Sequence, residues 1–474
     1  MMLLLLPVGL LLPTVSGWLT LRLVEKEHPV LLNLERWTLG CLLGTTLSMY
    51  LSFLAHIAGF MSLSLTGFLG IQVSYFLLVS LLWMRFHVSW HVKPVPSLPK
   101  NVRLSKPVTI LLATLMCWTL LKLIVGAVIL VSTPPYQDDV FNNWNMRGKL
   151  FGITNALTLE FAIGNDITAV GGVSSYPPTV SMTKTMLTDM ARQWHEGLAN
   201  SIHFVWFLCV LILVYCTLRR RMPAAWALAG VYGLSSLPLF FMHGVTPYAD
   251  VFMAAHIFAA VSMLYGAVSA QSDEHSASFL RLGALATGLL VFTKNEALLL
   301  YLPVILLLLV FILRHLHAHD VFGEKQVRRT VSNFAMALLL VGAPWILFKL
   351  AHNLPFGNAK SVSGLEIAWQ EGVAYAIIIN TFFEGNWALL IPLLLGCIVF
   401  FQKESLRSAT VIFTAFFLLL YIGQLPLFFF TGLSTEALNQ TGYARGLVQI
   451  APIGVTALFL IVHSVLSPPT AAKD

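Results

Sequence analysis

The sequence predicts an all-α polytopic membrane protein, and its composition, its apolar runs and the placement of its positive charges each support that fold class. Of the 474 residues, 57% are hydrophobic and 10% are charged. A soluble domain carries about 25% charged residues, so this chain lacks the polar surface that a soluble enzyme or a disordered chain needs. The five cysteines lie in apolar segments, which indicates packing residues rather than disulfides or a structural zinc site.

Apolar runs long enough to cross a bilayer recur along the chain. A spanning helix needs ~20 apolar residues to cross ~30 Å of hydrocarbon, and this criterion predicts about 13 transmembrane helices, within a range of about 11 to 14. The stretch 371–383 is apolar but too short to span, so we expect it to be re-entrant or interfacial. The spans are expected at 3–21, 38–58, 65–84, 108–131, 202–218, 223–242, 249–269, 279–293, 297–313, 331–350, 386–402, 409–430 and 447–466.

Lysine and arginine fall unequally on the alternate loops between these spans. Because positively charged loops stay in the cytoplasm, the amino terminus is expected outside, the carboxyl terminus in the cytoplasm, and loops 133–200 and 351–385 on the non-cytoplasmic side. Cytoplasmic loops that face anionic lipid also explain the net charge of +7 without a nucleic-acid partner. The first apolar run lacks the basic start of a signal peptide and is interpreted as a span. The predicted outer loops hold few of the 28 positive residues, namely Arg147, Lys149, Lys184, Arg192, Lys294, Lys360 and Arg445.

No loop is long enough for a sizeable separate domain, so residues 1–474 are expected to form a single membrane domain. The loop 133–200 is the predicted active-site loop, and 351–385 is the second non-cytoplasmic loop. Apolar side chains recur at helical spacing in two parts of the first loop, after Asp139 and within 181–200. Both parts are predicted to be amphipathic helices lying along the membrane interface.

Adjacent carboxylates, Asp138 and Asp139, follow the fourth predicted span. Carboxylates at this position are costly to desolvate, so one interpretation is a general base or metal ligand held at the membrane surface. The other interpretation is a cap for the helix that begins near Val140, because Asp is a preferred N-cap residue. The residues alone do not choose between the two.

Four segments, in order between about 130 and 300, resemble motifs of GT-C glycosyltransferases. Asp139–Phe151 (DVFNNWNMRGKLF) is similar to the Asp…Trp…Lys-x-Lys run of relatives of the protein mannosyltransferases and the lipid A aminoarabinose transferase. Ser175–Pro178 (SYPP) resembles their Tyr-Pro segment. Thr246–Asp250 (TPYAD) resembles their short outer-loop motif, and Gly288–Glu296 (GLLVFTKNE) resembles their Gly…Thr-Lys-Asn-Glu segment.

The resemblance implies an inverting glycosyltransferase that moves a sugar from a polyprenyl-phosphate donor, undecaprenyl- or dolichyl-phosphate, to an acceptor on the non-cytoplasmic face. The acceptor is a glycan, lipid or protein, and the other partners are membrane lipids. The implied location is a bacterial inner membrane, with the active site facing the periplasm or exterior. Asp139 matches the acidic position of the family and is the predicted catalytic base, with Asp138 as the reserve.

Cations on the predicted outer side are candidates to bind the donor phosphate. Lys294 lies beside Glu296 in a tight turn between two spans, and Arg445 precedes the last span. The alternatives are a Lys294–Glu296 pair at the headgroups and an interfacial anchor at Arg445. Lys149 and Arg147 are further phosphate candidates, although a solvated helix face explains them as well.

Substrate-binding roles are predicted for Tyr176, Asp250, Glu296 and Trp144, although capping of a helix is the simplest account of Asp250. No cofactor is expected to be required. A divalent metal held by Asp138, Asp250 and His243 is conceivable.

Two lysines lie within predicted spans, Lys122 and Lys349, and are functional candidates because buried ionisable groups in membranes usually have a role. The competing functions are a transporter or lipid flippase and a non-catalytic scaffold. A transporter should show repeated halves with ionisable groups near the membrane midplane, whereas here the acidic residues lie at the predicted outer edge.

Overall fold

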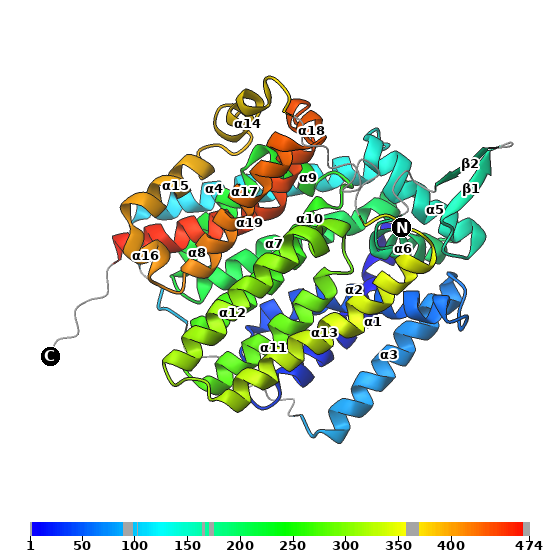
Figure 1. The fold of residues 1–474 in the computed structure, drawn as a ribbon, viewed down its shortest axis with the longest axis horizontal. Helices are drawn as coiled ribbons and strands as arrows, with labels where there is room; N and C mark the ends of the chain where they lie inside the picture. Colours follow the sequence, from blue (N-terminus) through cyan, green and yellow to red (C-terminus); the bar gives the residue numbers. More distant parts are fainter. Residues whose placement is uncertain are drawn as a thin grey trace.

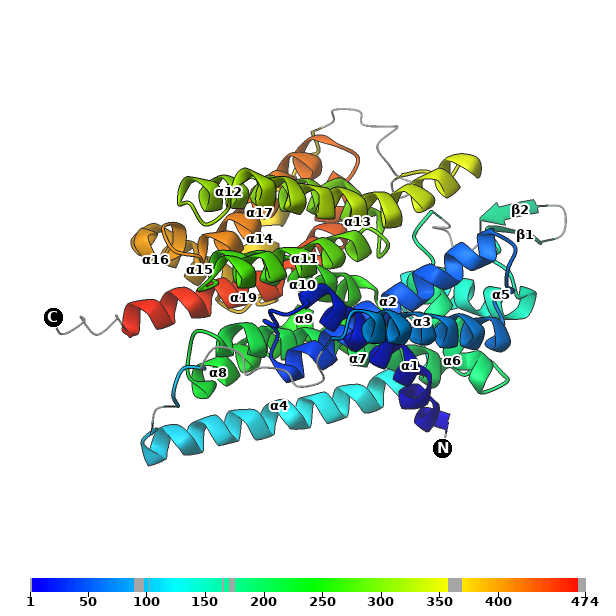
Figure 2. The ribbon, with the colours of Figure 1, turned by 90° about the horizontal axis from the view of Figure 1, so that it is seen from below.

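The computed structural model describes residues 2–88, 98–101, 103–163, 166–169, 175–356 and 369–467. The candidate cation Lys360 lies outside these residues. In the described part, long helices run roughly side by side in one bundle (Figures 1 and 2), as the composition predicts.

Within the residues that the structure describes, ten helices are long and apolar enough to cross a membrane. They correspond to ten of the predicted spans, and several extend beyond the predicted limits. They are α1 (Leu5–Glu25, continuous with η1, Met2–Leu4), α2 (Asn33–Ile57), α3 (Leu65–Arg85), α4 (Lys106–Ser132), α7 (Glu196–Arg219), α10 (Asp250–Val268), α12 (Leu302–Ala318, continuous with the π-helical η3, Ala297–Tyr301), α13 (Glu324–Ala351), α17 (Val411–Phe430) and α19 (Gly442–Leu466).

The remaining three predicted spans take other forms, so the described residues give ten or eleven spans by this criterion, against the expected number of about 13 within a range of about 11 to 14. The run 223–242 forms α8 (Ala224–Ser235) and α9 (Pro238–Gly244), which are bent by 82° and raise the number of spans to 11 if they count as one. Proline disfavours helical backbone in the residue before it, and Pro238 opens α9 directly after the break. The other two runs form α11 (Asp273–Leu290), which begins with a charged turn, and the short α15 (Leu390–Phe400).

Three short helices complete this part of the chain, namely α14 (Val373–Phe382), α16 (Gln402–Leu406) and α18 (Ser434–Leu438). As predicted, α14 is too short to span a membrane.

The first large loop contains two helical segments where the sequence predicts them and a hairpin that it does not predict. The second segment ends at Met190 instead of continuing to 200, because α7 begins separately at Glu196. A π-helical segment, η2 (Val140–Asn145), leads into α5 (Met146–Thr154), and α6 (Thr179–Met190) follows later. Strands β1 (Glu160–Ile163) and β2 (Asp166–Ala169) pair in antiparallel register.

The polar side of α6 was expected to face the interface, but it is enclosed by protein. Lys184 is fully buried in the middle of α6, where its ammonium donates to Asn145 Oδ1 (2.5 Å) and Asn200 Oδ1 (3.1 Å). The hydroxyl of Thr185 donates to the carbonyl of Gly148 (2.8 Å), which satisfies another polar group of this helix inside the protein.

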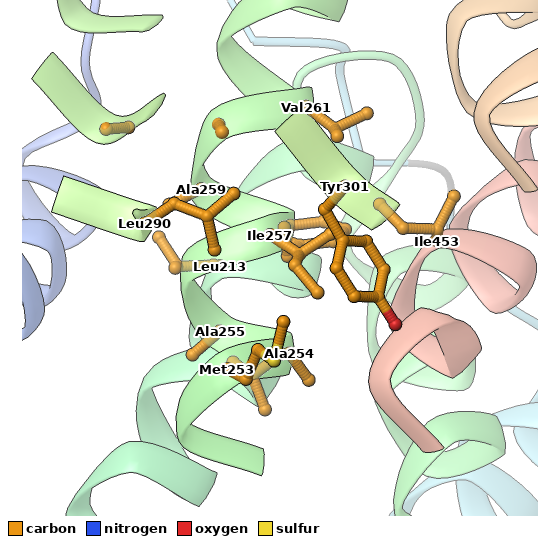
Figure 3. Packing of buried hydrophobic residues seen from close by; sticks show 14 of the residues in the cluster. Leu213, Met253, Ala254, Ala255, Ile257, Ala259, Val261, Leu290, Tyr301 and Ile453 are labelled. Carbon is orange, nitrogen blue, oxygen red and sulfur yellow. The ribbon is translucent and has the colours of Figure 1, made fainter. Parts of the chain in front are cut away.

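The core is centred on α10, which other helices enclose almost completely. Figure 3 shows its Met253, Ile257 and Val261 packed among side chains of the surrounding helices, including Leu213 of α7 and Ile453 of α19. A helix that is apolar on all sides is typical of the interior of a helical membrane protein. Asp250, at the first position of this buried helix, is therefore held in a rigid frame.

Helices α1 and α2 approach each other closely through glycines. A Cβ built on Gly44 would lie 2.2 Å from the carbonyl oxygen of Pro13, and one on Gly17 would lie 2.3 Å from that of Gly40. Small residues allow helix backbones to pack this closely in membranes. The pair α1–α2 is thereby fixed at its crossing point.

The first and last described helices reach opposite ends of the bundle. In Figures 1 and 2 the start of α1 lies beside α6 and the first large loop, whereas α19 runs away from them and ends at the other end of the bundle. The end that carries η2, α5 and α6 is called the loop end below.

Candidate active site

A buried carboxylate, Asp250, forms the centre of an ionic cluster at the loop end. Lys294 Nζ (3.1 Å) and Gln449 Nε2 (2.8 Å) donate to its Oδ1. Arg445 Nε donates to its Oδ2 (2.9 Å), and His243 Nδ1 lies 3.3 Å from the same oxygen. The carboxylate thus joins four side chains from three other parts of the chain, namely α9, the turn after α11 and α19, rather than capping α10 as the simplest prediction had it.

Arg445 links this buried centre to the protein surface. Its guanidinium also donates to Asp139 Oδ2, so one arginine bridges two carboxylates, and it lies over the ring of Tyr248 at 5.2 Å. Asp139 is 37% exposed and the Arg445 side chain is 25% exposed, whereas Asp250 is completely buried. The Asp139–Arg445 pair is therefore the part of the cluster that a ligand can reach.

A second branch of the cluster runs from Lys294 to an aromatic stack. Lys294 Nζ lies 3.2 Å from Glu296 Oε1, which also accepts a hydrogen bond from the Tyr176 hydroxyl (3.2 Å). The rings of Tyr176 and Trp144 are stacked, with centroids 5.4 Å apart. Glu296 is 32% exposed, so this branch also reaches the surface.

The electrostatics of Lys294 depend on its two acidic neighbours. Burial alone would lower the pKa of its ammonium, but the carboxylates of Asp250 and Glu296 outweigh burial and raise that pKa above its ordinary value. Lys294 therefore stays charged, and Asp250 and Glu296 hold it in place.

Two further cations fix the backbone behind the aromatic stack. Arg147 Nη2 donates to the carbonyl of Tyr176 (2.9 Å), and Lys349 Nζ donates to the carbonyl of Ser175 (2.7 Å) and to Asn295 Oδ1 (3.1 Å). Both side chains are buried. They hold the Ser175–Tyr176 backbone against the turn that carries Lys294.

The structure thus brings together most of the predicted site residues, and three lie outside the ionic cluster. Asp138 is exposed and accepts a hydrogen bond from Asn142, Lys149 is exposed on α5, and Arg147 is buried behind Tyr176. Lys122, the other predicted buried lysine, donates to the Ser235 carbonyl (3.1 Å) at the α8–α9 break.

A metal site is not formed by the candidates that the sequence suggests. His243 and Asp250 are adjacent, but Asp138 bonds with Asn142 instead of joining them. Over the described ranges, no three His, Cys, Asp or Glu side chains are grouped in a way that could hold a metal ion.

Three contributors were not predicted, namely Gln449, Tyr248 and Tyr301. Gln449 lies one helical turn after Arg445, and this spacing on a helix would have placed both side chains on one face. Tyr301 donates to Gln449 Oε1 (2.6 Å) and so completes the second layer around Asp250. In Figure 3 the Tyr301 hydroxyl points toward α19.

The structure is similar to the crystal structure of ArnT from Cupriavidus metallidurans in the apo state. The match has a TM-score of 0.51 and 14% sequence identity, and it covers 75% of this chain. The fold is that of ArnT. The GT-C fold predicted from the sequence is thereby confirmed. The described part of the chain contains ten apolar spans, so the protein is an integral membrane protein.

The aligned region spans 60% of the ArnT chain. No protein-family model matches the sequence, and no curated protein matches it.

Proposed function

We propose that the protein is an inverting glycosyltransferase, which moves a sugar from a polyprenyl-phosphate donor to an acceptor on the non-cytoplasmic face of the membrane. The observation that carries this proposal is the ionic cluster of Asp250, Lys294, Arg445 and Asp139, which is buried at its centre and open to solvent at Asp139 and Arg445. The ArnT-like fold supports it, because ArnT is a lipid A aminoarabinose transferase of the GT-C fold.

Asp139 is the proposed general base. An acceptor hydroxyl is a weak nucleophile and needs a base within about 3 Å. As Asp139 takes the hydroxyl proton, the acceptor oxygen forms a bond to the anomeric carbon of the sugar, and the bond from that carbon to the phosphate oxygen breaks. The lipid phosphate leaves with the bonding electron pair, and a single displacement of this kind inverts the anomeric centre.

Arg445 is the proposed contact for the leaving phosphate. Its guanidinium is partly exposed and can form two parallel hydrogen bonds to phosphate oxygens. A donor phosphate that takes Arg445 from Asp139 would free the carboxylate to accept a proton, so donor binding and activation of the base would be coupled. Asp250 would hold the other edge of the guanidinium through its bond to Arg445 Nε.

Lys294 supports this site from behind in the proposed mechanism. Its side chain is 1% exposed and bonded to Asp250 and Glu296, so it balances their charges while they orient Arg445 and Tyr176. Direct contact of Lys294 with a phosphate stays a prediction. The stacked Trp144 and Tyr176 rings are buried, and Lys294 lies over the Tyr176 ring, so they too support the site from behind, and their direct contact with a sugar stays a prediction.

The orientation in the membrane follows from the charge distribution of the sequence. With positive loops in the cytoplasm, the loop end faces the exterior, or the periplasm if the membrane is a bacterial inner membrane. Arginine and lysine can stabilise a leaving phosphate without a divalent metal, so the proposed reaction needs no cofactor.

Replacement of the proposed base tests the mechanism. We expect Asp139→Asn to lower sugar transfer by roughly 10²- to 10⁴-fold while the protein still folds, because the Asp139 side chain is 37% exposed. Asp138→Asn, measured beside it, tests the reserve base one residue away, and Asp273→Asn provides an exposed control in the first turn of α11. Full activity of Asp139→Asn would remove Asp139 from the mechanism.

A further inference from the structure

A lateral cavity lies beside the candidate active site, between η3–α12, α17 and α19. Its volume is about 180 Å³, and its lining includes Leu299, Tyr301, Leu419, Gln424 and Gly446. Leu299 is 45% exposed and Leu419 is 39% exposed. Because all three helices are apolar spans, these exposed leucines place the mouth of the cavity toward the lipid.

One polar group in this cavity has no hydrogen-bond partner. Gln424 is 8% exposed, and its Nε2 is a buried donor that bonds to no described atom. An unpaired buried amide costs free energy, more so where lipid excludes water. A ligand that brings an acceptor oxygen into the cavity would remove this cost.

The cavity adjoins the ionic cluster along α19 and through Tyr301. Gly446 lines it and directly follows Arg445, and a Cβ built on Gly446 would lie 2.6 Å from Gln424 Oε1. Glycine at this position therefore makes room for the glutamine side chain. Tyr301 lines the cavity as well, and its hydroxyl bonds to Gln449, which donates to Asp250.

The depth of Gln424 also fits the junction between a lipid tail and its phosphate. Six residues separate Gln424 from Phe430, the last residue of α17, which corresponds to about 9 Å at 1.5 Å per residue. A 20-residue helix such as α17 spans only about 30 Å, the thickness of the hydrocarbon, so Gln424 lies inside the hydrocarbon edge. The first carbon atoms of a lipid chain would lie near this level if its phosphate were bound at Arg445.

The volume agrees with one isoprene unit. An apolar cavity of about 150 Å³ holds a benzene molecule, with six carbon atoms, and an isoprene unit has five.

We propose that this cavity binds the phosphate-proximal isoprene unit of the polyprenyl-phosphate carrier, and that Gln424 Nε2 donates a hydrogen bond to an oxygen of its phosphate group. Gln424 is thus a specificity-determining residue, which recognises the point where a branched apolar chain meets a phosphate. The inference rests on the proposed function, because it assumes that the donor is a polyprenyl phosphate.

Photolabelling of the full-length protein tests this assignment. The probe is a polyprenyl phosphate with a diazirine on its first isoprene unit, and mass spectrometry locates the labelled residues. We expect label on η3 and on α17 near Gln424, and competition by unlabelled polyprenyl phosphate but not by a diacyl phospholipid. Label on other segments, or equal competition by the phospholipid, would overturn the proposal in favour of an ordinary boundary-lipid site.

Affinity measurements on three variants identify the role of the amide. Gln424→Met keeps the side-chain volume and removes the donor, so we expect about tenfold to hundredfold weaker binding of the probe. Gly446→Ala displaces the Gln424 side chain, and we expect binding to weaken in the same direction. Gln402→Met makes the same chemical change at an exposed site on α16 and should leave affinity unchanged. Wild-type affinity in Gln424→Met would refute the role of the amide.

The outcomes also separate this inference from the proposed function. Label in the cavity without sugar transfer from any donor would contradict the glycosyltransferase and leave the carrier site standing. Transfer with label elsewhere would contradict the cavity assignment alone. A folded wild-type protein that binds no polyprenyl phosphate would overturn both.

Discussion

Removal of the charge of Asp250 should destabilise the protein strongly, because this buried carboxylate contacts four polar or charged side chains of the candidate site. In Asp250→Asn, Lys294 and Arg445 each lose an ionic acceptor at about hydrogen-bond distance, and Gln449 faces an amide instead of a carboxylate. Loss of one partner of a buried ion pair costs ~3–5 kcal/mol. Lys294 keeps Glu296 and Arg445 keeps Asp139, so we expect the lower end of that range, about 3 kcal/mol.

Equilibrium unfolding in mixed micelles measures this effect, with Asp273→Asn as the exposed control. The control should change the free energy of unfolding by less than about 1 kcal/mol. Lys294→Met in the Asp250→Asn background should cost less than in the wild type, by about 1–3 kcal/mol of coupling. An Asp250→Asn protein within about 0.5 kcal/mol of the wild type would show that the cluster does not hold these elements together.

Three other perturbations test separate parts of the structure. Burial lowers the pKa of Lys184 to about 7, although Glu196 acts to raise it, so between about pH 7 and 10 the unfolded chain binds more protons than the folded protein. The free energy of unfolding should therefore rise with pH across that window, by up to about 1.4 kcal/mol per pH unit. Unfolding experiments at several pH values should show that Lys184→Met removes this dependence on pH. Gly44→Ala should lower the free energy of unfolding by roughly 1–3 kcal/mol, because the new methyl group meets the Pro13 carbonyl at 2.2 Å, whereas Gly70→Ala, with open space around it, should not destabilise α3. Treatment with a chelator should leave the transfer rate unchanged, and a loss that added Mg²⁺ or Mn²⁺ restores would show that the reaction uses a metal.

Much of the fold could be predicted from the sequence because membrane spans are defined by local composition. In the described ranges, ten predicted apolar runs form spans, several of which extend beyond their predicted limits. The wrong predictions of spans arise where local composition does not determine whether an apolar run forms one straight helix. The run 223–242 is apolar throughout, yet it bends by 82° at Pro238, and Lys122 of a distant span satisfies the Ser235 carbonyl at the break.

The burial of α6 could not be predicted for a similar reason. Its spacing of polar and apolar residues is that of an interfacial helix. However, Lys184 bonds to Asn145 and Asn200, which belong to elements that only the tertiary structure brings close to α6. Periodicity shows that a helix has two different sides, and it does not show whether water or protein faces the polar one.

The candidate site was predicted in part, because its charged residues are unusual in so apolar a chain. Asp139, Asp250, Lys294 and Arg445 lie far apart in the sequence, and the structure joins them directly. Gln449 was missed because a single amide in a span carries no charge that would distinguish it. The transporter alternative loses support, since the cluster lies at one end of the bundle and not at its middle.

The most direct test of the proposed mechanism is the configuration of the anomeric carbon after transfer. Purified protein is incubated with a panel of polyprenyl-phosphate sugars and candidate acceptors, and the product is examined by NMR. We expect that one donor is consumed and that its sugar appears on the acceptor with inverted anomeric configuration. Retention of configuration would contradict direct displacement with Asp139 as base, and failure to consume any donor would contradict the proposed function itself.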